Sequence, residues 1–477
     1  MKRPALVLAA GVLVAALACK DDVTQPQTPS APQGPSFTLV ANISVTDLLA
    51  GASGWAMAVN DLGQVAGVRV IEGSPGTWID YHPFLWQDGA ITDLESPGLT
   101  QPLAINSGRQ VIGWSGQALE GIMWQDGLMT SLGRFSPAAI NDLGQIAGYV
   151  PNWWSGGAGL WQNGTMTLLG APEQSAALDI NNLGQIVGMM HWQSPETHAF
   201  LWQAGTITDL GTLGGSWSRT GSGCYHGSQF INDFGQIVGG SLTANGAFHA
   251  FLWQNGTMTD LGILAGTTYS EASGINNLGE VVGISAGPPS FEGRAFLWRH
   301  GTMTDLGIPG SVNSCVLIND LGQVVANSEG LSRPFLWHNG TITDLGAAVG
   351  GGSWAEGISN LGQVVGGSWA PDETQYRARL WSTLRPATPA EEITVLINDL
   401  NTLVANGVLN QGQVNGLLTK LSAVSRQLER ENSAAATQLL QAFINQVRAY
   451  MNAGILSSVN GQTLIDAAQN AITQLGG

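Results

Sequence analysis

The sequence predicts an all-β fold, an eight-bladed β-propeller of four-stranded blades closed by the N-terminal strand, followed by a small all-α bundle. Three observations predict it: a hairpin motif written many times, a second turn motif repeated with it, and a change to helical apolar spacing after residue 385. Self-similarity at a period of about 40 residues is typical of propellers and solenoids. Each repeat therefore supplies one structural unit.

The hairpin motif is most complete between His249 and Gly262. Its centre is Asn255-Gly256, flanked by alternating apolar residues. This pattern favours a type I′ turn, because both central positions need positive φ. A two-residue loop places His249 opposite Gly262. Because side chains alternate along a strand, His249 and Asp260 share one face as diagonal neighbours, within reach of a charge pair.

Other copies carry the same pairing. A cation and an aspartate occur together as His82–Asp93, His198–Asp209, His249–Asp260, Arg294–Asp305 and Arg333–Asp344. Arg377 has no hairpin strand after it, and Asp47 precedes the first full repeat. We therefore expect the Asp47 strand to pair with the last repeat, so that Asp47 meets Arg377 and the ring closes. We interpret the pairs as structural, because a catalytic or metal site needs no such repetition.

The second motif is an Asn-Asp-x-Gly turn between two apolar runs, as in residues 140–148. Asx side chains bond the nearby backbone, and glycine takes the left-handed position. Two turns per repeat give four antiparallel strands, which is the composition of a propeller blade. An open solenoid is the alternative, but it leaves the Asp47 strand without a role. Calcium is a weaker reading of the turns, since each offers only one or two side-chain oxygens.

The two motifs together, Ala-Phe-Leu-Trp-x-Asn-Gly-x-Met-Thr-Asp-Leu-Gly and Ile-Asn-Asp-x-Gly-Gln-Val-Val-Gly, resemble the bacterial extracellular HAF repeat family over residues 37–384. The resemblance implies export and a repeat architecture. It implies no defined reaction and carries over no catalytic residues.

The net charge of −17 speaks against nucleic acid and anionic lipid headgroups as partners. Three cysteines are too few for a disulfide scaffold. Cys224 and Cys315 fall on connections of non-adjacent repeats, which leaves little scope for a disulfide between them. No pattern of a cofactor site, phosphate loop or metal site is found, and we expect a monomer.

Residues 1–18 read as a signal peptide, with Lys2 and Arg3 before an apolar run. The run ends at Cys19 and resembles a lipoprotein lipobox, which implies acylation of Cys19, although Ala16 stands where leucine is usual. Residues 19–36 form a flexible tether. In the lipoproteins that this segment resembles, Asp directly after the cysteine favours inner-membrane retention, so the resemblance with Lys20 at that position implies the outer membrane or cell surface, with the membrane contacted only through the lipid. An unacylated, secreted form is the alternative, since Ala16-x-Ala18 also fits ordinary signal cleavage.

Both tight turns lie on one rim of such a propeller, so the variable connections lie on the other. Tryptophans outside the hairpins gather in or beside these connections: Trp55, Trp78, Trp114, Trp153, Trp154, Trp192, Trp217, Trp354 and Trp369. An aromatic face with little charge suits stacking on sugar rings or binding of another protein. The alternative is that these side chains fill gaps between blades.

Residues 385–390 read as a linker, and residues 391–477 show helical apolar stripes. Four stripes predict a small antiparallel bundle. The segment from Gln438 to Val447 resembles the FIMAH module that ends many secreted bacterial proteins, over about residues 391–475. This resemblance implies an accessory role outside the cell.

The sequence thus favours a non-enzymatic cell-surface lipoprotein that binds glycan or protein through its Trp-bearing face. A purely structural envelope component is one alternative. A carbohydrate-active hydrolase or lyase is another, with acidic candidates on the same face: Glu72, Asp80, Glu173, Glu196, Glu271 and Glu356.

Overall fold

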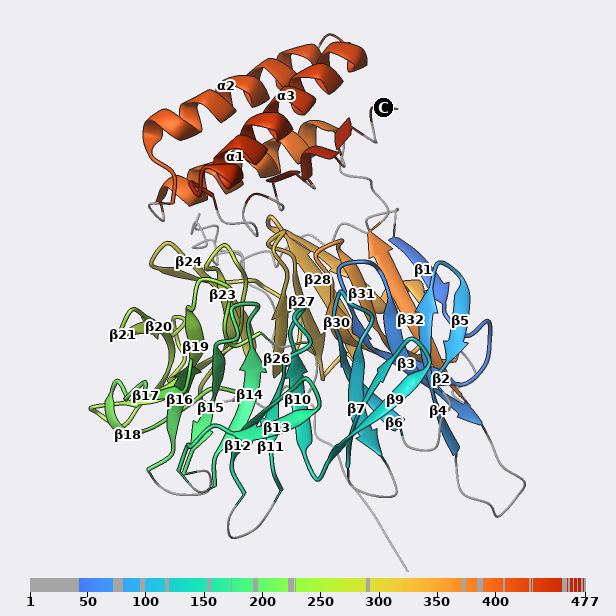
Figure 1. Cartoon of the computed structure of the whole chain (residues 1–477), viewed down its shortest axis with the longest axis vertical. Helices are drawn as coiled ribbons and strands as arrows, with labels where there is room; N and C mark the ends of the chain where they lie inside the picture. The colour runs from blue at the N-terminus through green and yellow to red at the C-terminus, as the bar shows by residue number, and fades with distance from the viewer. Residues whose placement is uncertain are drawn as a thin grey trace, which may run out of the picture. The chain divides into compact units, whose positions relative to one another are not determined.

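The protein consists of many short antiparallel strands followed by helices (Figure 1). The computed structural model describes residues 43–475, apart from 72–79, 95–98, 116–119, 152–155, 173, 192–195, 222–226, 228, 289–291, 371–374, 384–388, 406–407, 429, 431, 457–460, 462–463, 466, 470 and 473–474. The predicted signal peptide, Cys19 and the tether lie outside the described residues.

Four consecutive strands pair in chain order in most sheets. The first two such units are β2 (Gly54–Val59), β3 (Val65–Ile71), β4 (Asp80–Gln87), β5 (Ala90–Asp93), and β6 (Leu99–Ile105), β7 (Val111–Ser115), β8 (Gly121–Gln125), β9 (Leu128–Gly133). The next two are β10 (Ser136–Ile140), β11 (Ile146–Tyr149), β12 (Ala158–Gln162), β13 (Thr165–Leu168), and β14 (Ala176–Ile180), β15 (Ile186–Met190), β16 (His198–Gln203), β17 (Thr206–Asp209).

Two further units join into one eight-stranded sheet, because β20 and β22 pair at Phe248 and Tyr269. They are β18 (Gly214–Arg219), β19 (Ile237–Thr243), β20 (Phe248–Gln254), β21 (Thr257–Gly262), and β22 (Tyr269–Ile275), β23 (Val281–Ala286), β24 (Arg294–Arg299), β25 (Thr302–Asp305). After them come β26 (Val312–Ile318), β27 (Val324–Ser328), β28 (Arg333–His338) and β29 (Thr341–Asp344), followed by the 3-10 helix η1 (Gly346–Ala348).

The last sheet joins the two ends of the repeat region. β30 (Ser353–Ile358), β31 (Gln363–Trp369) and β32 (Tyr376–Thr383) are completed by β1 (Ile43–Asp47). β1 runs antiparallel to β32, with Ile43 opposite Thr383 and Asp47 opposite Arg379. The predicted pairing of the first strand with the last repeat is confirmed.

The residue that Asp47 meets was predicted wrongly. Arg379 Nη1 lies 3.7 Å from Asp47 Oδ2, whereas Arg377 stands opposite Ser368 on β31. In the hairpins that carry the aspartate a phenylalanine faces it, as Phe251 faces Asp260, and the predicted cation stands diagonally. Opposite Asp47 the facing residue is itself an arginine, Arg379. The ion pair therefore forms with the residue directly opposite and not with the diagonal Arg377.

The hairpins have the predicted two-residue turn. Asn255 and Gly256 have φ values of 51° and 82°, and Trp253 pairs with Met258. One detail differs from the prediction: a bulge places Gly262 opposite Ala250 instead of His249. The phenylalanine of each complete hairpin, such as Phe251, is fully buried.

Replacing Asn255 and Gly256 together by alanine should destabilise the protein by about 2 kcal/mol, because the left-handed conformation costs alanine roughly 1 kcal/mol per residue. Both residues are exposed, so no buried contact is lost. Urea denaturation measures the effect, and Asn255→Gly is the control, because glycine accepts positive φ. Identical midpoints for the double variant and the parent would contradict the turn assignment.

The Asn-Asp-x-Gly turns are joined to one another around a ring. In the third turn, Asn141 Oδ1 accepts from the amides of Leu143 and Gln145, and its Nδ2 donates to Asn181 O in the next turn at 3.0 Å. The same inter-turn bond starts from Asn60, Asn106, Asn141, Asn181, Asn232, Asn276 and Asn319. Asn360 closes the circle, donating its amide and Nδ2 to Asp61 at 2.8 and 2.9 Å.

In each unit except β26–β29, one glycine in the second strand packs against the innermost strand, and Ala326 holds the corresponding place on β27. A Cβ on Gly283, for example, would overlap the carbonyl oxygen of Glu271. We call the residue that supplies this carbonyl the inner position. Around the ring, the inner positions that contact these glycines are Trp55, Gln101, Ser136, Ala176, Arg219, Glu271 and Trp354. The backbone geometry is thus repeated while the side chain is free to vary.

The helices are α1 (Pro389–Ala405), α2 (Gln411–Leu428) and α3 (Ser433–Asn452). Asn432 caps α3 by accepting a hydrogen bond from the Ala435 amide at 3.2 Å. The predicted stripes meet in one core that includes Leu396, Leu417 and Phe443. The fourth predicted helix falls in a stretch that is described only in part, but its Leu464 and Ile465 are buried in the same core.

Candidate functional site

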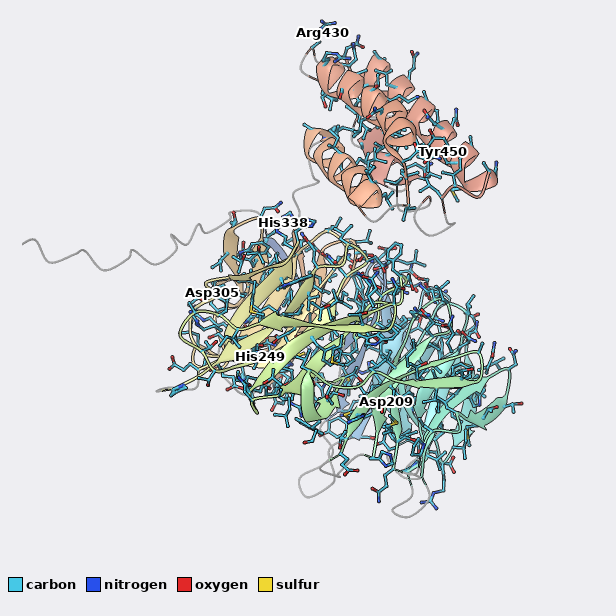
Figure 2. The ribbon with its side chains drawn as sticks, turned by 90° about the vertical axis from the view of Figure 1, so that its left-hand side faces the viewer. Asp209, His249, Asp305, His338, Arg430 and Tyr450 are labelled. Atoms are coloured by element: carbon cyan, nitrogen blue, oxygen red, sulfur yellow. The ribbon has the colours of Figure 1, made fainter. Side chains whose placement is uncertain are left out.

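The cation–aspartate pairs lie on the outer hairpins (Figure 2). The nitrogen–oxygen distances are 2.8 Å for His198–Asp209 and 2.9 Å each for His249–Asp260, Arg294–Asp305 and Arg333–Asp344. The same aspartates accept a backbone amide, as Asp260 does from Gly262. Each pair therefore fixes the start of the following connection, which is a structural role.

In the first unit the contacts differ from this pattern. Arg69 on β3 lies 3.2 Å from Asp93, and His82 lies 3.1 Å from Asp80. Arg69 stands opposite His82 in the register, and its longer side chain reaches the aspartate.

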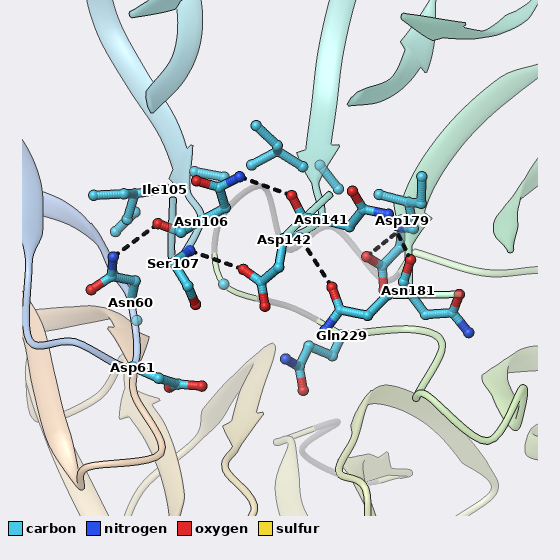
Figure 3. A pocket seen from close by; sticks show the side chains of 18 of the residues that line it. Asn60, Asp61, Ile105, Asn106, Ser107, Asn141, Asp142, Asp179, Asn181 and Gln229 are labelled. Atoms are coloured by element: carbon cyan, nitrogen blue, oxygen red, sulfur yellow. Dashed lines mark hydrogen bonds between the residues drawn. The ribbon is translucent and has the colours of Figure 1, made fainter. Parts of the chain in front are cut away.

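A cavity of about 630 Å³ lies at the centre of the ring and is lined by the Asn-Asp-x-Gly turns (Figure 3). The second residue of each turn lines this cavity, and aspartates alternate with neutral side chains around it: Asp61, Ser107, Asp142, Asn182, Asp233, Asn277, Asp320 and Asn360. Burial raises the pKa of Asp320 to about 6, and the charges of Asp61 and Asp233 act in the same direction. The aspartates therefore give the cavity a negative electrostatic potential. Among the described residues, no group of three carboxylate, His or Cys side chains is placed to hold a metal ion.

A connection between β18 and β19 enters the ring and contacts strands of other units. We call its described residues, from Thr220 to Ile231, the channel loop. A Cβ on Gly227 would lie 2.7 Å from Glu356 O on β30, and Gln229 O accepts from the Ile275 amide on β22 at 2.9 Å. Gln229 also lines the cavity (Figure 3).

Asp179 on β14 holds the channel loop from the other side. Its Oδ2 accepts the amides of Phe230 at 2.7 Å and Ile231 at 3.2 Å, and its Oδ1 accepts the Ile180 amide at 2.8 Å. Burial raises the pKa of Asp179 to about 6, against the opposing effect of these hydrogen bonds.

Of the predicted tryptophans, Trp55, Trp114, Trp217, Trp354 and Trp369 are described, and each is half-buried. Trp78, Trp153, Trp154 and Trp192 lie outside the described residues, as do Glu72, Glu173 and Cys224. The structure brings three of the tryptophans together with two tyrosines that the sequence reasoning missed.

Tyr376 is the centre of this group. Its ring lies 4.2 Å from that of Trp369, 5.7 Å from Trp55 and 5.9 Å from Trp354, and Tyr81 contacts Trp55 at 5.9 Å. We call these five residues the Tyr376 cluster. They come from two neighbouring sheets, at the strand ends away from the Asn-Asp-x-Gly turns.

Glu356 belongs to the same region. It is the bulged residue between Ala355 and Gly357 of β30. Burial raises the pKa of Glu356 to about 7, opposed by a hydrogen bond from the Trp354 side chain.

Trp217 belongs to a separate group, which we call the Arg219 cluster: Trp217, Arg219, Phe248, Tyr269 and Glu271. Arg219 Nε and Nη2 donate to the Glu271 carboxylate at 2.6 and 2.8 Å, and Tyr269 donates its hydroxyl to the same carboxylate. The arginine also lies over the Trp217 and Phe248 rings, at 5.1 and 5.7 Å.

A sequence signal for both clusters was present. The triplets Gly239-Gly240-Ser241 and Gly366-Gly367-Ser368 carry an extra glycine next to the repeated one. A Cβ on Gly240 would overlap the Phe248 ring, and one on Gly367 would overlap the Trp354 ring. In these two units the extra glycine therefore leaves room for an aromatic ring of the cluster against the strand.

Comparison with known proteins assigns the helical end of the chain. Residues 393–473 match the FIMAH domain family. The FIMAH module thus comprises α1, α2, α3 and the partly described final segment, with the core around Phe443. The search of curated proteins found no match to this sequence.

Solved structures similar to this chain include an acylaminoacyl peptidase from Pyrococcus horikoshii. It is 13% identical over 66% of this chain and 57% of that chain, with a TM-score of 0.39. A prolyl endopeptidase is 10% identical over 64% and 50%, with a TM-score of 0.41. The chain therefore spans only about half the length of these peptidases. An Aleuria aurantia lectin in complex with Fucalpha1-6GlcNAc is 12% identical over 63% and 96%, with a TM-score of 0.28. Likenesses at this level say nothing about activity.

Among the described helices, none combines the length and apolar character that a membrane-spanning helix needs.

Proposed function

We propose that the protein is an exported surface lipoprotein whose β region is a non-enzymatic binding scaffold. In this proposal Cys19 is acylated, residues 19–36 are the tether, and the ring is an eight-bladed propeller in which the eight-stranded sheet represents two blades. HAF-type repeats build the propeller, and the FIMAH module serves as an accessory domain.

The ligand we propose is a glycan bound at the Tyr376 cluster. The observation that carries this proposal is the convergence of five half-exposed or half-buried aromatic side chains from two sheets. Aromatic faces provide apolar contact area for the C–H face of a sugar ring at little entropic cost. Tyr81 is 43% exposed, so the cluster reaches the surface.

The ring does not need these aromatics for its own geometry. Trp55 and Trp354 occupy the inner position, where other sheets carry Gln101, Ser136 or Ala176 on the same backbone. Because the same backbone contact forms with a serine or an alanine in other units, it requires no tryptophan here. Large aromatic side chains placed without structural need are characteristic of binding surfaces.

Tyr376→Ala should lower glycan affinity at least tenfold, since loss of a central aromatic contact costs about 1.4 kcal/mol or more. A glycan array identifies the ligand, and calorimetry compares parent and variant. Trp114→Ala is the matched control, because Trp114 is a half-buried tryptophan on β7, in another sheet. Equal losses in both variants, or no glycan bound by the parent, would refute the assignment. Specific capture of a protein instead would replace glycan by a protein ligand.

A second candidate function is glycan cleavage, favoured by Glu356. A carboxyl group with a pKa of about 7 is suited to general acid or base catalysis at neutral pH. If this holds, Glu356→Gln abolishes release of reducing ends from the bound polysaccharide while affinity is retained. Absence of turnover by the parent leaves binding as the function.

A further inference from the structure

The Arg219 cluster contains an ion pair that is costly to bury. The Glu271 side chain is only 2% exposed. Among the described residues, its carboxylate accepts hydrogen bonds from the side chains of Arg219 and Tyr269. Taking the carboxylate and most of the guanidinium out of water is offset only if their geometry is good, and apolar residues of similar size are often as stable. A reason beyond stability is therefore needed for this pair.

The fold itself does not supply that reason. Arg219 and Glu271 occupy the inner position in two units that follow one another around the ring. Other units have Gln101, Ser136 or Ala176 there, without charge. The pair is a local replacement on a repeated backbone, as Trp55 and Trp354 are in the Tyr376 cluster.

The geometry leaves part of the arginine available. Nε and Nη2 donate to Glu271 at hydrogen-bonding distance, and the Tyr269 hydroxyl lies near the same guanidinium; Nη1 makes no such bond to Glu271. The Arg219 side chain is 31% exposed. A buried carboxylate thus holds the guanidinium in one orientation and leaves a donor group unused beside the surface.

Aromatic rings stand next to this donor. Trp217 and Phe248 have ring centroids 5.1 Å apart, and Phe248 stacks on Tyr269 at 5.3 Å. Trp217 is half-buried, so the residue is partly accessible to solvent. An apolar ring beside a fixed N–H donor matches the two surfaces of a sugar, its C–H face and its hydroxyl oxygens.

We infer that the Arg219 cluster is a second carbohydrate-binding site, which takes a neutral sugar ring stacked on Trp217 with a hydroxyl oxygen accepting from Arg219 Nη1. Glu271 already neutralises the arginine, and the chain carries a net charge of −17, so a neutral sugar is favoured over an acidic one. Glu271 and Tyr269 act as positioning residues. The site is independent of the Tyr376 cluster, because its residues come from β18, β20 and β22.

The test uses the full chain labelled with 5-fluorotryptophan, and the probes are methyl glycosides of glucose, galactose, mannose and fucose. The fluorine resonance that disappears in Trp217→Phe reports this site alone. We expect one of the glycosides to shift that resonance in saturable fashion, in the parent and equally in Tyr376→Ala. No saturable shift with any of the four probes would overturn the inference, whatever happens at the Tyr376 cluster.

The role of the arginine is tested without leaving a buried charge unpaired. Arg219→Met combined with Glu271→Met removes both charges together, and the urea midpoint checks that the variant is folded. The double variant should bind the glycoside at least tenfold more weakly, and Tyr269→Phe should weaken it less. Unchanged affinity in the folded double variant would show that Arg219 makes no contact with the sugar. Binding that is lost in Tyr376→Ala but kept in the double variant would refute this site and support only the first.

Discussion

A chain that begins at Leu48 should be less stable than a chain that begins at Ile43 by about 4 kcal/mol. The shorter chain lacks β1, which pairs with β32 at five register positions and contributes Ile43 and Val45 to the core around Trp381. Each ladder hydrogen bond contributes roughly 1 kcal/mol net, and burial of the two apolar side chains adds to this. Loss of β1 also leaves β32 as an unpaired edge, which favours aggregation.

The longer chain, residues 43–477, is the matched control, because it lacks the same N-terminal segment and keeps the closing strand. Urea denaturation gives the difference in unfolding free energy, and light scattering reports aggregation. If the two chains unfold at the same urea concentration, β1 does not close the ring in solution.

Asp179→Ala should destabilise the protein by about 2–4 kcal/mol at pH 7. The change leaves the amides of Phe230 and Ile231 without their acceptor, and each buried unsatisfied amide costs roughly 1–3 kcal/mol. The substitution also removes the free-energy cost of burying the carboxylate, which offsets part of this destabilisation. The channel loop should also become more sensitive to proteolysis. Asp179→Asn is the control, since its amide oxygen still accepts from the loop, and it should be affected less.

The pH dependence of this residue has a definite sign. Its pKa is raised from 3.8 to about 6, so the folded state takes up a proton more readily than the unfolded state between these values. Stability from Asp179 therefore rises as the pH falls from 7 towards 4, and it falls as the pH rises through 6. Between pH 7 and pH 5, the unfolding free energy of the parent should gain roughly 1 kcal/mol relative to Asp179→Asn. A constant difference across this range would contradict the assigned pKa.

The local parts of the fold were predictable because short-range chemistry determines them. Asn255-Gly256 fixes its hairpin by the positive φ of two adjacent residues, and the position of Asp47 before the first repeat indicated the closing strand. The choice between Arg377 and Arg379 depended on which side chain stands directly opposite Asp47, and the sequence reasoning considered only the diagonal position.

The two aromatic clusters were harder to predict because their contacts cross from one repeat to the next. Trp55 and Tyr376 are neighbours only because the ring is closed, and periodicity within one repeat carries no information about them. The channel loop was missed for the same reason, since Asp179 and Phe230 belong to different units. The extra glycines at Gly240 and Gly367 were the available signal, and they read as ordinary strand glycines until the rings that cover them are known.

The channel loop ties distant parts of the ring together from within. Gly227 lies against Glu356 on β30 while Ile231 remains bound to Asp179 on β14, so strands of different sheets share one internal attachment. Separating the units at one seam of the ring must therefore also break contacts made by this loop, which couples local opening to the loss of contacts elsewhere.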